Sequence, residues 1–249
     1  MTDVDVAAEA ARAAAEVLTA LRADGRLTGR ELGDAGDAAA QAAIAAVLAA
    51  RRPRDLVFSE EAADDTRRLA AERVWVVDPL DGTREYAEPG RPDWAVHVAL
   101  WATGELASAA VALPALGELL VTDPAPAVPP PGRGRPRIAV SRTRPPAVAA
   151  AAARELDAEL VPMGSAGWKV TAVVRGEADA YVHAGGMYQW DSAAPVAVAR
   201  AAGLTALRLD GSPLVYNLPD PSLPDLLVCR PELAGRLLAA VRGGSPPPP

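Results

Sequence analysis

The sequence predicts an α/β fold whose N-terminal half is of the α+β type. Two alanine-rich segments near the N-terminus carry apolar residues at helical spacing, and short β-rich runs follow them. In the second half, β-rich runs alternate with helical stretches. A Pro/Gly-rich segment lies between the halves, so we expect an N-terminal α+β subdomain over residues 1–130 and a C-terminal α/β subdomain over residues 131–249.

The first two elements are predicted to be helices. Val, Leu and Ile recur among alanines at helix-compatible spacing in Val4–Arg22 and in Asp37–Arg51. Asp37 is a candidate N-cap of the second helix, because an Asp side chain accepts hydrogen bonds from the free N–H groups of a first turn. The intervening Gly25–Gly36 mixes Gly, Thr, Arg and acidic residues without apolar periodicity, and we expect a loop there.

Strands are predicted to dominate the rest of the first half. Four β-rich runs are bounded by charged residues, Pro or Gly, which favours a sheet flanked by the two helices: Leu56–Phe58, Val74–Val77, Ala95–Trp101 and Ala107–Leu113. The following Asp123–Pro136 is rich in Pro and Gly, which support neither a regular strand ladder nor a helix. We expect it to be an exposed connection.

The second half is predicted to alternate strands with helices. The expected strands are Arg137–Val140, Ala178–Val182 and Leu226–Val228. The expected helices are Ala147–Leu156, Ser192–Ala202 and Pro231–Arg242. The closing GGSPPPP has the composition of a disordered tail, and the sequence contains no internal repeat.

Composition excludes several classes of protein. The chain has 249 residues, of which 50% are hydrophobic, enough for a substantial core. A formal net charge of −7 argues against a nucleic-acid polymer as partner, because such binders cluster Lys and Arg. Cys229 is the sole cysteine, so an intramolecular disulfide cannot form and a reducing, cytoplasmic location is expected. No uncharged apolar run is long enough for a membrane span, and a secretory signal is absent.

A candidate metal site follows one of the hydrophobic runs. Asp78 comes directly after Val77, and Pro79 and Gly82 favour a tight turn. That turn brings Asp81 beside Asp78 and exposes the carbonyl of Leu80. Carboxylate and carbonyl oxygens are the ligands that Mg²⁺ prefers. Asp-Pro and Asp-Gly are also ordinary turn dipeptides, so other acidic positions must support the interpretation.

Two further acidic positions give that support. Glu60 comes just after the predicted strand Leu56–Phe58, and Asp191 precedes the helical stretch Ser192–Ala202, where helix capping is its ordinary role. A cluster of carboxylates repels itself without a cation, and a phosphate ester adds more negative charge. The sequence therefore predicts metal-assisted phosphoryl transfer, with the helix N-termini beside Asp191 and Thr83 as further donors to phosphate.

Other chemistries find little support. His97 lies in an apolar predicted strand, which favours a hydrogen-bonded core histidine over a ligand, and no G-x-S-x-G motif is present. A P-loop and a dinucleotide-binding fingerprint are also missing from the sequence. Trp75, Trp94 and Trp101 lie in strand-like runs and are expected in the core.

Four sequence blocks, in this order, resemble the signatures of the inositol monophosphatase superfamily: VFSEE (57–61), WVVDPLDGTREY (75–86), GSAGWK (164–169) and WDSAAPVAVARAAG (190–203). The continuation of DGT by Arg84-Glu85-Tyr86 resembles the CysQ-like branch of 3′(2′),5′-bisphosphate nucleotidases. The resemblance implies a layered αβαβα sandwich of the inositol monophosphatase and fructose-1,6-bisphosphatase type. It places the site in a cleft between two subdomains.

The resemblance also implies a set of metal ligands. It makes Glu60, Asp78 and the Leu80 carbonyl ligands of one Mg²⁺. A second Mg²⁺ would be held by Asp78, Asp81 and Asp191. A third ion would depend on the N-terminal block that ends at Asp37, which departs from the family pattern, so two or three ions are expected.

Catalytic and substrate contacts are implied in the same way. Thr83, paired with Asp37, would orient the attacking water, which makes Thr83, Asp37 and Glu60 the expected catalytic residues. The expected substrate contacts are Leu80, Gly82, Thr83, Arg84, Gly164, Ser165, Lys169 and Asp191. Lys169 is the sole lysine, which favours a specific role, with an exposed helix lysine as the alternative. Trp168 and Tyr188 are candidates for contacting adenine.

The implied activity is hydrolysis of the 3′-phosphate of 3′-phosphoadenosine 5′-phosphate to AMP and phosphate, by two-metal in-line attack of water. Inositol monophosphate and fructose 1,6-bisphosphate are alternative substrates of the same site. A phosphate-ligand sensor without turnover is an alternative of another class. The resemblance further implies inhibition by lithium, and a homodimer stays an open alternative.

Overall fold

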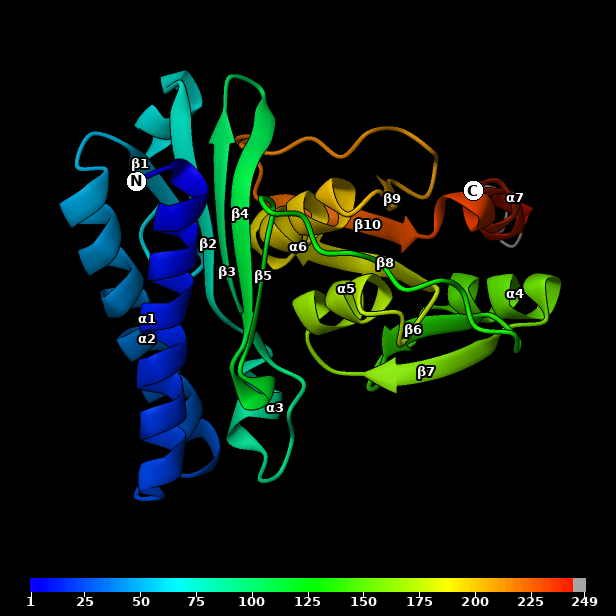
Figure 1. Cartoon of the computed structure of the whole chain (residues 1–249), viewed down its shortest axis with the longest axis horizontal. Helices are drawn as coiled ribbons and strands as arrows, with labels where there is room; N and C mark the ends of the chain where they lie inside the picture. Colours follow the sequence, from blue (N-terminus) through cyan, green and yellow to red (C-terminus); the bar gives the residue numbers. More distant parts are fainter. Residues whose placement is uncertain (244–249) are drawn as a thin grey trace.

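The computed structural model describes residues 1–243, so the expected C-terminal tail lies outside the described residues from residue 244 onward. Two five-stranded sheets and three layers of helices are stacked in the order helix, sheet, helix, sheet, helix (Figure 1). The layered αβαβα architecture expected from the sequence is confirmed. Within residues 1–243, no helix combines the length and the apolar character that crossing a membrane requires.

The first layer consists of α1 (Asp3–Asp24) and α2 (Gly29–Arg51), which pack against each other and against one face of the first sheet. Thr2 caps α1, because its hydroxyl accepts the Asp5 N–H at 3.2 Å while the Asp5 carboxylate accepts the Thr2 N–H at 2.9 Å. Buried alanines on α1 allow the two helices to approach closely.

The helix α2 begins earlier than the sequence predicted. Residues 29–36, expected in a loop, form its first two turns, so Asp37 lies inside the helix and not at its cap. A Cβ atom at Gly33 would lie 2.8 Å from Thr83 Cγ2, and one at Gly36 would meet Tyr86 Cε1 at 2.8 Å. The glycines of this segment therefore permit close packing on the turn after β2 and do not mark a loop.

The first sheet has the strand order β1-β2-β3-β4-β5. Only β1 and β2 are parallel; the other neighbours are antiparallel. The strands are β1 (Leu56–Ser59), β2 (Arg73–Asp81), β3 (Ala95–Ala102), β4 (Glu105–Leu113) and β5 (Glu118–Val121). Three short helices connect them: the 3₁₀ helices η1 (Thr66–Ala70) and η2 (Pro114–Leu116), and α3 (Thr83–Ala87). The strand β5 was not predicted from the sequence.

The second sheet has the strand order β7-β6-β8-β10-β9. Its strands are β6 (Arg137–Ser141), β7 (Glu159–Met163), β8 (Ala180–Tyr188), β9 (Thr205–Leu207) and β10 (Ser222–Cys229). The helices of this half are α4 (Ala147–Leu156), α5 (Ala166–Val174), α6 (Gln189–Ala201), the 3₁₀ helix η3 (Pro231–Leu233) and α7 (Ala234–Gly243). The strands β7 and β9 and the helix α5 were not predicted. The strand β8 starts two residues later and ends six residues later than expected.

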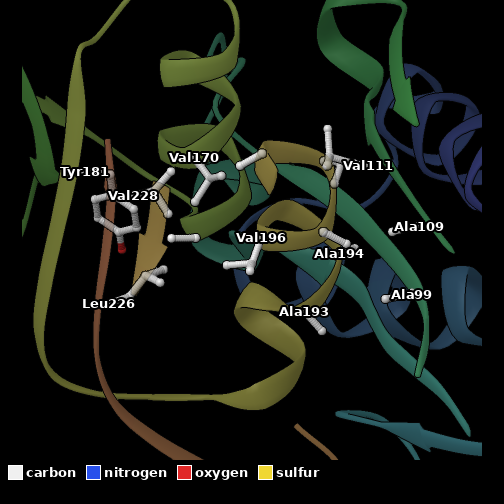
Figure 2. Close-up of a cluster of buried hydrophobic side chains, with 14 of the residues drawn as sticks. Ala99, Ala109, Val111, Val170, Tyr181, Ala193, Ala194, Val196, Leu226 and Val228 are labelled. Carbon is white, nitrogen blue, oxygen red and sulfur yellow. The ribbon is translucent and has the colours of Figure 1, made fainter. Parts of the chain in front are cut away.

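The helices α5 and α6 lie between the two sheets and form the middle of the core. Figure 2 shows side chains of the first sheet, of these helices and of the second sheet meeting there: Ala99, Ala109, Val111, Val170, Ala193, Ala194, Val196, Tyr181, Leu226 and Val228. The helices α4 and α7 cover the outer face of the second sheet. The predicted connection between the halves has no helix or strand from residue 122 to residue 136, and the subdomain boundary at residue 130 stays a prediction.

Alternation in β2 explains why this strand reads as a continuous apolar run. Val74 and Val76 face α6 and the second sheet, whereas Trp75 and Val77 face α1 and α2. Both faces of the strand are thus covered by helices, which requires apolar residues at every position. Asp78 continues this run and is consequently buried as well.

Candidate active site

Asp78 is the central carboxylate of the site. It is 1% exposed and pairs across the sheet with His97, just before the β2–β3 ladder shifts register between Asp78 and Asp81. Its Oδ1 accepts the Leu80 N–H at 3.1 Å. Its Oδ2 is buried and has no hydrogen-bond partner within the described part of the chain. Such an oxygen is costly to bury without a cation or a proton.

Glu60 and Asp191 come from other elements to the same place. The Glu60 N–H donates to the Val77 carbonyl at 3.3 Å, which fixes the end of β1 beside β2. Asp191 is the third residue of α6, which begins at Gln189 and not at Ser192, so Asp191 is not the N-cap that its position before Ser192 suggested. Its Oδ2 instead accepts the N–H of the N-cap residue Tyr188 at 2.6 Å. One carboxylate oxygen from each of Glu60, Asp78 and Asp191 lies within 4.8 Å of the others. This all-oxygen donor set fits a hard divalent cation such as Mg²⁺.

The three carboxyl groups disfavour one another's charge. Burial, together with Asp81, raises the pKa of Asp191 to about 7. Partial burial and the nearby Asp191 raise the pKa of Glu60 to about 7, although much of the residue is exposed. Burial, followed by the charges of Asp81 and Glu60, raises the pKa of Asp78 well above its usual range. A bound cation would reverse these shifts by favouring the ionised forms.

Asp81 faces the N-terminus of α5 and is not part of the three-carboxylate cluster. Its carboxylate accepts the Ser165 hydroxyl, the Ala166 N–H at 3.1 Å and the Gly167 N–H at 2.6 Å. The Ser165 hydroxyl in turn accepts the Trp168 N–H at 2.9 Å. These hydrogen bonds join the end of β2 to α5, which lies between the sheets. The expected role of Asp81 as a metal ligand stays a prediction.

Lys169 is 5% exposed, so the alternative of an exposed helix lysine is wrong. Its Nζ donates to the Ser165 carbonyl at 2.5 Å and to the Gly164 carbonyl at 3.1 Å. The ammonium also lies 5.2 Å from the centroid of the Tyr181 ring. Burial lowers the pKa of Lys169 to about 8. The lysine therefore holds the turn that presents Ser165 to Asp81.

The expected pair of Thr83 and Asp37 is brought together by α2 and α3. Thr83 Oγ1 lies 3.3 Å from Asp37 Oδ1 and 3.2 Å from the Leu80 carbonyl, and its hydroxyl donates to these acceptors. Burial, with the nearby Glu61, raises the pKa of Asp37 to about 6. Gly82 has φ +91°, and a Cβ there would lie 3.1 Å from Ser165 Cβ, so glycine is required.

Arg84 and Gly164, two of the expected substrate contacts, differ in exposure, because Gly164 is buried. Arg84 is exposed and, with Thr83 and Gly33, lines a cavity of about 500 Å³ between α2 and α3. The Gly164 N–H donates to Asp93 Oδ2 at 2.6 Å. Asp93 was not identified from the sequence, because an Asp before a strand has no distinctive pattern.

His97 is a core histidine, as expected. It is fully buried, and its Nδ1 lies 3.2 Å from the Trp190 carbonyl. Its Nε2 lies 3.4 Å from Asp81 Oδ2, and burial lowers its pKa. Its place beside Asp78 and Asp81 was missed, although the alternation of β3 puts it on the face of Ala95 and Ala99 that meets the helix layer.

The aromatic candidates separate into buried and exposed residues. Trp75 and Trp94 are buried as expected, and Trp101 is partly buried. Trp168 is also buried, with the Arg175 guanidinium 4.8 Å from its ring centroid. Tyr188 is 49% exposed and is stacked on Trp190, with ring centroids 4.9 Å apart and an interplanar angle of 18°. Of the two candidate adenine contacts, Tyr188 has the accessible ring.

Residues 1–123 and 136–244 match the sequence model of a family described as the inositol monophosphatase family. The unmatched residues between these ranges fall in the Pro-rich connection. The chain belongs to the inositol monophosphatase family. It is accordingly an enzyme that hydrolyses phosphoric monoesters.

Relatives with named activities match most of the chain. A "3'-phosphoadenosine 5'-phosphate phosphatase" of Mycobacterium leprae is 49% identical over 97% of this chain and 94% of its own length. A protein of the same name from Mycobacterium tuberculosis is 54% identical over 84% of this chain and 82% of its own length. The "3'(2'),5'-bisphosphate nucleotidase CysQ" of Escherichia coli K12 is 32% identical over 59% of this chain and 63% of its own length.

Solved structures show the same fold. A crystal structure of CysQ from Bacteroides thetaiotaomicron has a TM-score of 0.79 and 25% sequence identity, and the match covers 92% of this chain and 97% of that one. Inositol monophosphatase II from Staphylococcus aureus has a TM-score of 0.81 at 19% identity, over 97% of this chain and 96% of that one. The second likeness shows the fold alone.

Proposed function

We propose that this enzyme is a Mg²⁺-dependent phosphatase that removes the 3′-phosphate of 3′-phosphoadenosine 5′-phosphate to give AMP and phosphate. The activity named for its mycobacterial relatives supports the choice of substrate. Two observations carry the proposal: carboxylate oxygens of Glu60, Asp78 and Asp191 lie within 4.8 Å of one another, and Oδ2 of Asp78 is buried without a hydrogen-bond partner among the described residues. These carboxylates form a cation site, and a phosphate ester needs a cation there to approach them.

The metal is proposed to bind between the strand ends and α6. Glu60, Asp78 and the Leu80 carbonyl would hold one Mg²⁺, and Asp78, Asp191 and Asp81 would hold a second. Bound Mg²⁺ supplies charge neutralisation for the phosphoryl oxygens and makes water more acidic. Asp81 accepts three hydrogen bonds from α5 and the residue before it, so metal ligation would use the one of about four carboxylate lone pairs that these donors leave free.

Thr83 and Asp37 are proposed to position the attacking water. The Thr83 hydroxyl donates to Asp37, which leaves the hydroxyl oxygen free to accept a hydrogen bond from water. With a pKa of about 6, Asp37 is mostly ionised at neutral pH and can take up a proton through Thr83. The backbone N–H groups of Gly82 and Thr83 are the proposed donors to the phosphate. Tyr188 is the proposed contact for adenine.

The decisive experiment compares three substrates with the same enzyme. Phosphate release from 3′-phosphoadenosine 5′-phosphate, inositol monophosphate and fructose 1,6-bisphosphate is measured while Mg²⁺ and then Li⁺ are titrated. We expect the highest kcat/KM for the nucleotide, dependence on Mg²⁺ and inhibition by Li⁺. A higher kcat/KM for inositol monophosphate or for fructose 1,6-bisphosphate would overturn the substrate assignment. Binding of the nucleotide without turnover would favour a sensor.

A further inference from the structure

A fully buried arginine holds the segment that carries Glu60. Arg68, in η1, is 0% exposed. Its guanidinium lies 3.7 Å from the ring centroid of Phe58, which precedes Glu60 in the chain. The same group forms a bidentate pair with Asp64, which follows Glu60, at 2.6 Å from Nε and 3.0 Å from Nη2. Arg68 thus contacts the chain on both sides of this proposed ligand.

The guanidinium also reaches the loop that precedes β10. Its Nη1 donates to Asn217 Oδ1 at 2.8 Å, and its Nη2 donates to the Leu218 carbonyl at 3.1 Å. Asn217 Nδ2 donates back to the Arg68 carbonyl at 3.1 Å, so the contact is reciprocal. Asn217 is buried and has φ +59°, a left-handed conformation that Asn tolerates better than most residues.

Gln189 continues this contact to the helix that carries Asp191. The side chain of Gln189 is fully buried; its Oε1 accepts the Leu218 N–H at 3.2 Å, and its Nε2 donates to the Asp220 carbonyl at 2.7 Å. A second contact runs beside the polar one, because the rings of Phe58 and Trp190 pack edge to face with centroids 5.1 Å apart.

We infer that Arg68, Asn217 and Gln189 form a positioning bridge that holds Glu60 opposite Asp191 before metal binds. The inference rests on the metal site of the proposed function. The two carboxylates come from opposite halves of the chain and repel each other when both are ionised. The bridge opposes their separation, so the cation meets ligands that are already arranged.

The expected size of the effect follows from the indirect action of the bridge on the metal ligands. Arg68, Asn217 and Gln189 act through the backbones of the ligands and are positioning residues. Residues that orient metal ligands typically change metal affinity by about 10–100-fold when they are removed. Once saturating metal has drawn the ligands together, the loss of the bridge should have little effect on the chemical step.

Asn217→Gly tests the bridge with the least disturbance of the backbone. The variant removes the side-chain hydrogen bonds between Asn217 and Arg68. It keeps the loop geometry, because glycine adopts the left-handed conformation without steric strain. Asn217→Asp is the conservative partner, because it keeps an acceptor for Arg68 and tolerates the same φ. Calorimetric titration of metal-free protein with Mg²⁺ should give a dissociation constant raised about tenfold for Asn217→Gly and restored towards wild type for Asn217→Asp.

Arg230→Gln is the matched control. Arg230 is a buried arginine that pairs with Asp179 at 3.0 Å and donates to the Pro129 carbonyl at 2.8 Å, a set of partners like that of Arg68. Asp179 precedes β8, whereas Asp191 follows its other end. This control should lose thermal stability without a change in Mg²⁺ affinity.

Hydrogen exchange of the metal-free proteins separates the bridge from the proposed function. In Asn217→Gly, amides of residues 59–65 and of the first turn of α6 should exchange faster than in wild type, and Arg230→Gln should leave them unchanged. Unchanged exchange in these segments, or an unchanged Mg²⁺ affinity in Asn217→Gly, would overturn the bridge. If wild-type protein does not bind Mg²⁺, the proposed function fails, and exchange still decides whether the bridge exists.

Discussion

The hydroxyl of Thr83 donates to the carboxylate of Asp37 at 3.3 Å, although the two residues are 46 positions apart in the chain. This bond joins the interior of α2 to the start of α3. It depends on the close approach of the two helices at Gly33. The pair proposed to position water is therefore brought together by helix packing.

Replacing Asp37 by Asn tests its proposed role as proton acceptor. The change keeps the size of the side chain and removes its basicity, so kcat should fall by about 10²-fold while KM changes little. Steady-state kinetics at saturating Mg²⁺ measure this. Glu31→Gln, in the first turn of the same helix, is the control, because Glu31 is exposed. Equal kcat in the two variants would remove Asp37 from the mechanism.

Gly33→Ala should lower kcat although alanine is the better helix former. The new Cβ would lie 2.8 Å from Thr83 Cγ2 and must displace that side chain from Asp37. Gly235→Ala is the matched control in α7, where a Cβ meets nothing within 4 Å, and it should raise the free energy of unfolding by about 0.5–1 kcal/mol. Wild-type kcat in Gly33→Ala would show that Thr83 need not be held in place.

Asp78→Asn should separate stability from activity. The substitution removes a buried charge from the carboxylate cluster at constant volume, so turnover should fall by about 10²–10³-fold. The metal-free variant should nevertheless be at least as stable as wild type near neutral pH, because the burial and the neighbouring carboxylates that raise the pKa of Asp78 no longer act on an ionisable group. Thermal unfolding and phosphate release measure the two effects. Wild-type turnover would contradict the metal assignment.

The metal-free enzyme should lose stability from the cluster as pH rises. The pKa of Asp191 is raised from 3.8 to about 7, and that of Glu60 from 4.5 to about 7. The folded state therefore binds more protons than the unfolded state across this window, so these groups stabilise the fold at low pH and that contribution is lost as pH approaches 7. Added Mg²⁺ should consequently raise Tm more at about pH 8 than at about pH 5.

The variant Asp191→Asn is the control for this pH dependence. Asp191→Asn removes one of the raised carboxyl groups, so the Mg²⁺-induced rise in Tm should become smaller at the higher pH. A rise in Tm that is equal at both pH values in wild type would show that the cluster does not bind the ion.

Tyr188→Ala tests the proposed contact with adenine. The exposed ring is stacked on Trp190 and can present its outer face to a base, a contact typically worth about 1–3 kcal/mol. KM for 3′-phosphoadenosine 5′-phosphate should rise about tenfold with kcat unchanged, and Tyr188→Phe should restore it. The apparent KM for inositol monophosphate, which lacks a base, should not change. An equal rise for both substrates would point to a disturbed metal site.

The sequence indicated which acidic residues gather at the site better than it indicated the contacts between residues that are distant in the chain. The strand β2 could be predicted, because burial on both of its faces requires a continuous apolar run. The acidic residues at its end could be predicted as well, because they stand in turn dipeptides. The helical conformation of residues 29–36 could not, since Gly33 is explained by Thr83, which is distant in sequence. Lys169 looked like a surface residue or a substrate contact, and its carbonyl partners become visible only when α5 is in place.

The contacts of the positioning bridge could not be predicted from local sequence patterns either. Arg68 and Asn217 are 149 positions apart, and neither lies in a recognisable motif. Leu226–Val228 and Ala178–Val182 were identified as strands because their own composition favours them. The short strand β9 carries too few residues for such a pattern, and its pairing with β10 decides its conformation.

The placement of Asp191 on a helix between the sheets has a consequence for how the enzyme acquires its activity. Asp78 lies in β2 and Glu60 directly follows β1, whereas Asp191 lies in α6, which packs between the two sheets. Under the proposed function, the metal site would therefore be complete only when α6 is packed on the first sheet. Cleavage within residues 122–136 would give two pieces whose reunion could be timed by the return of phosphate release.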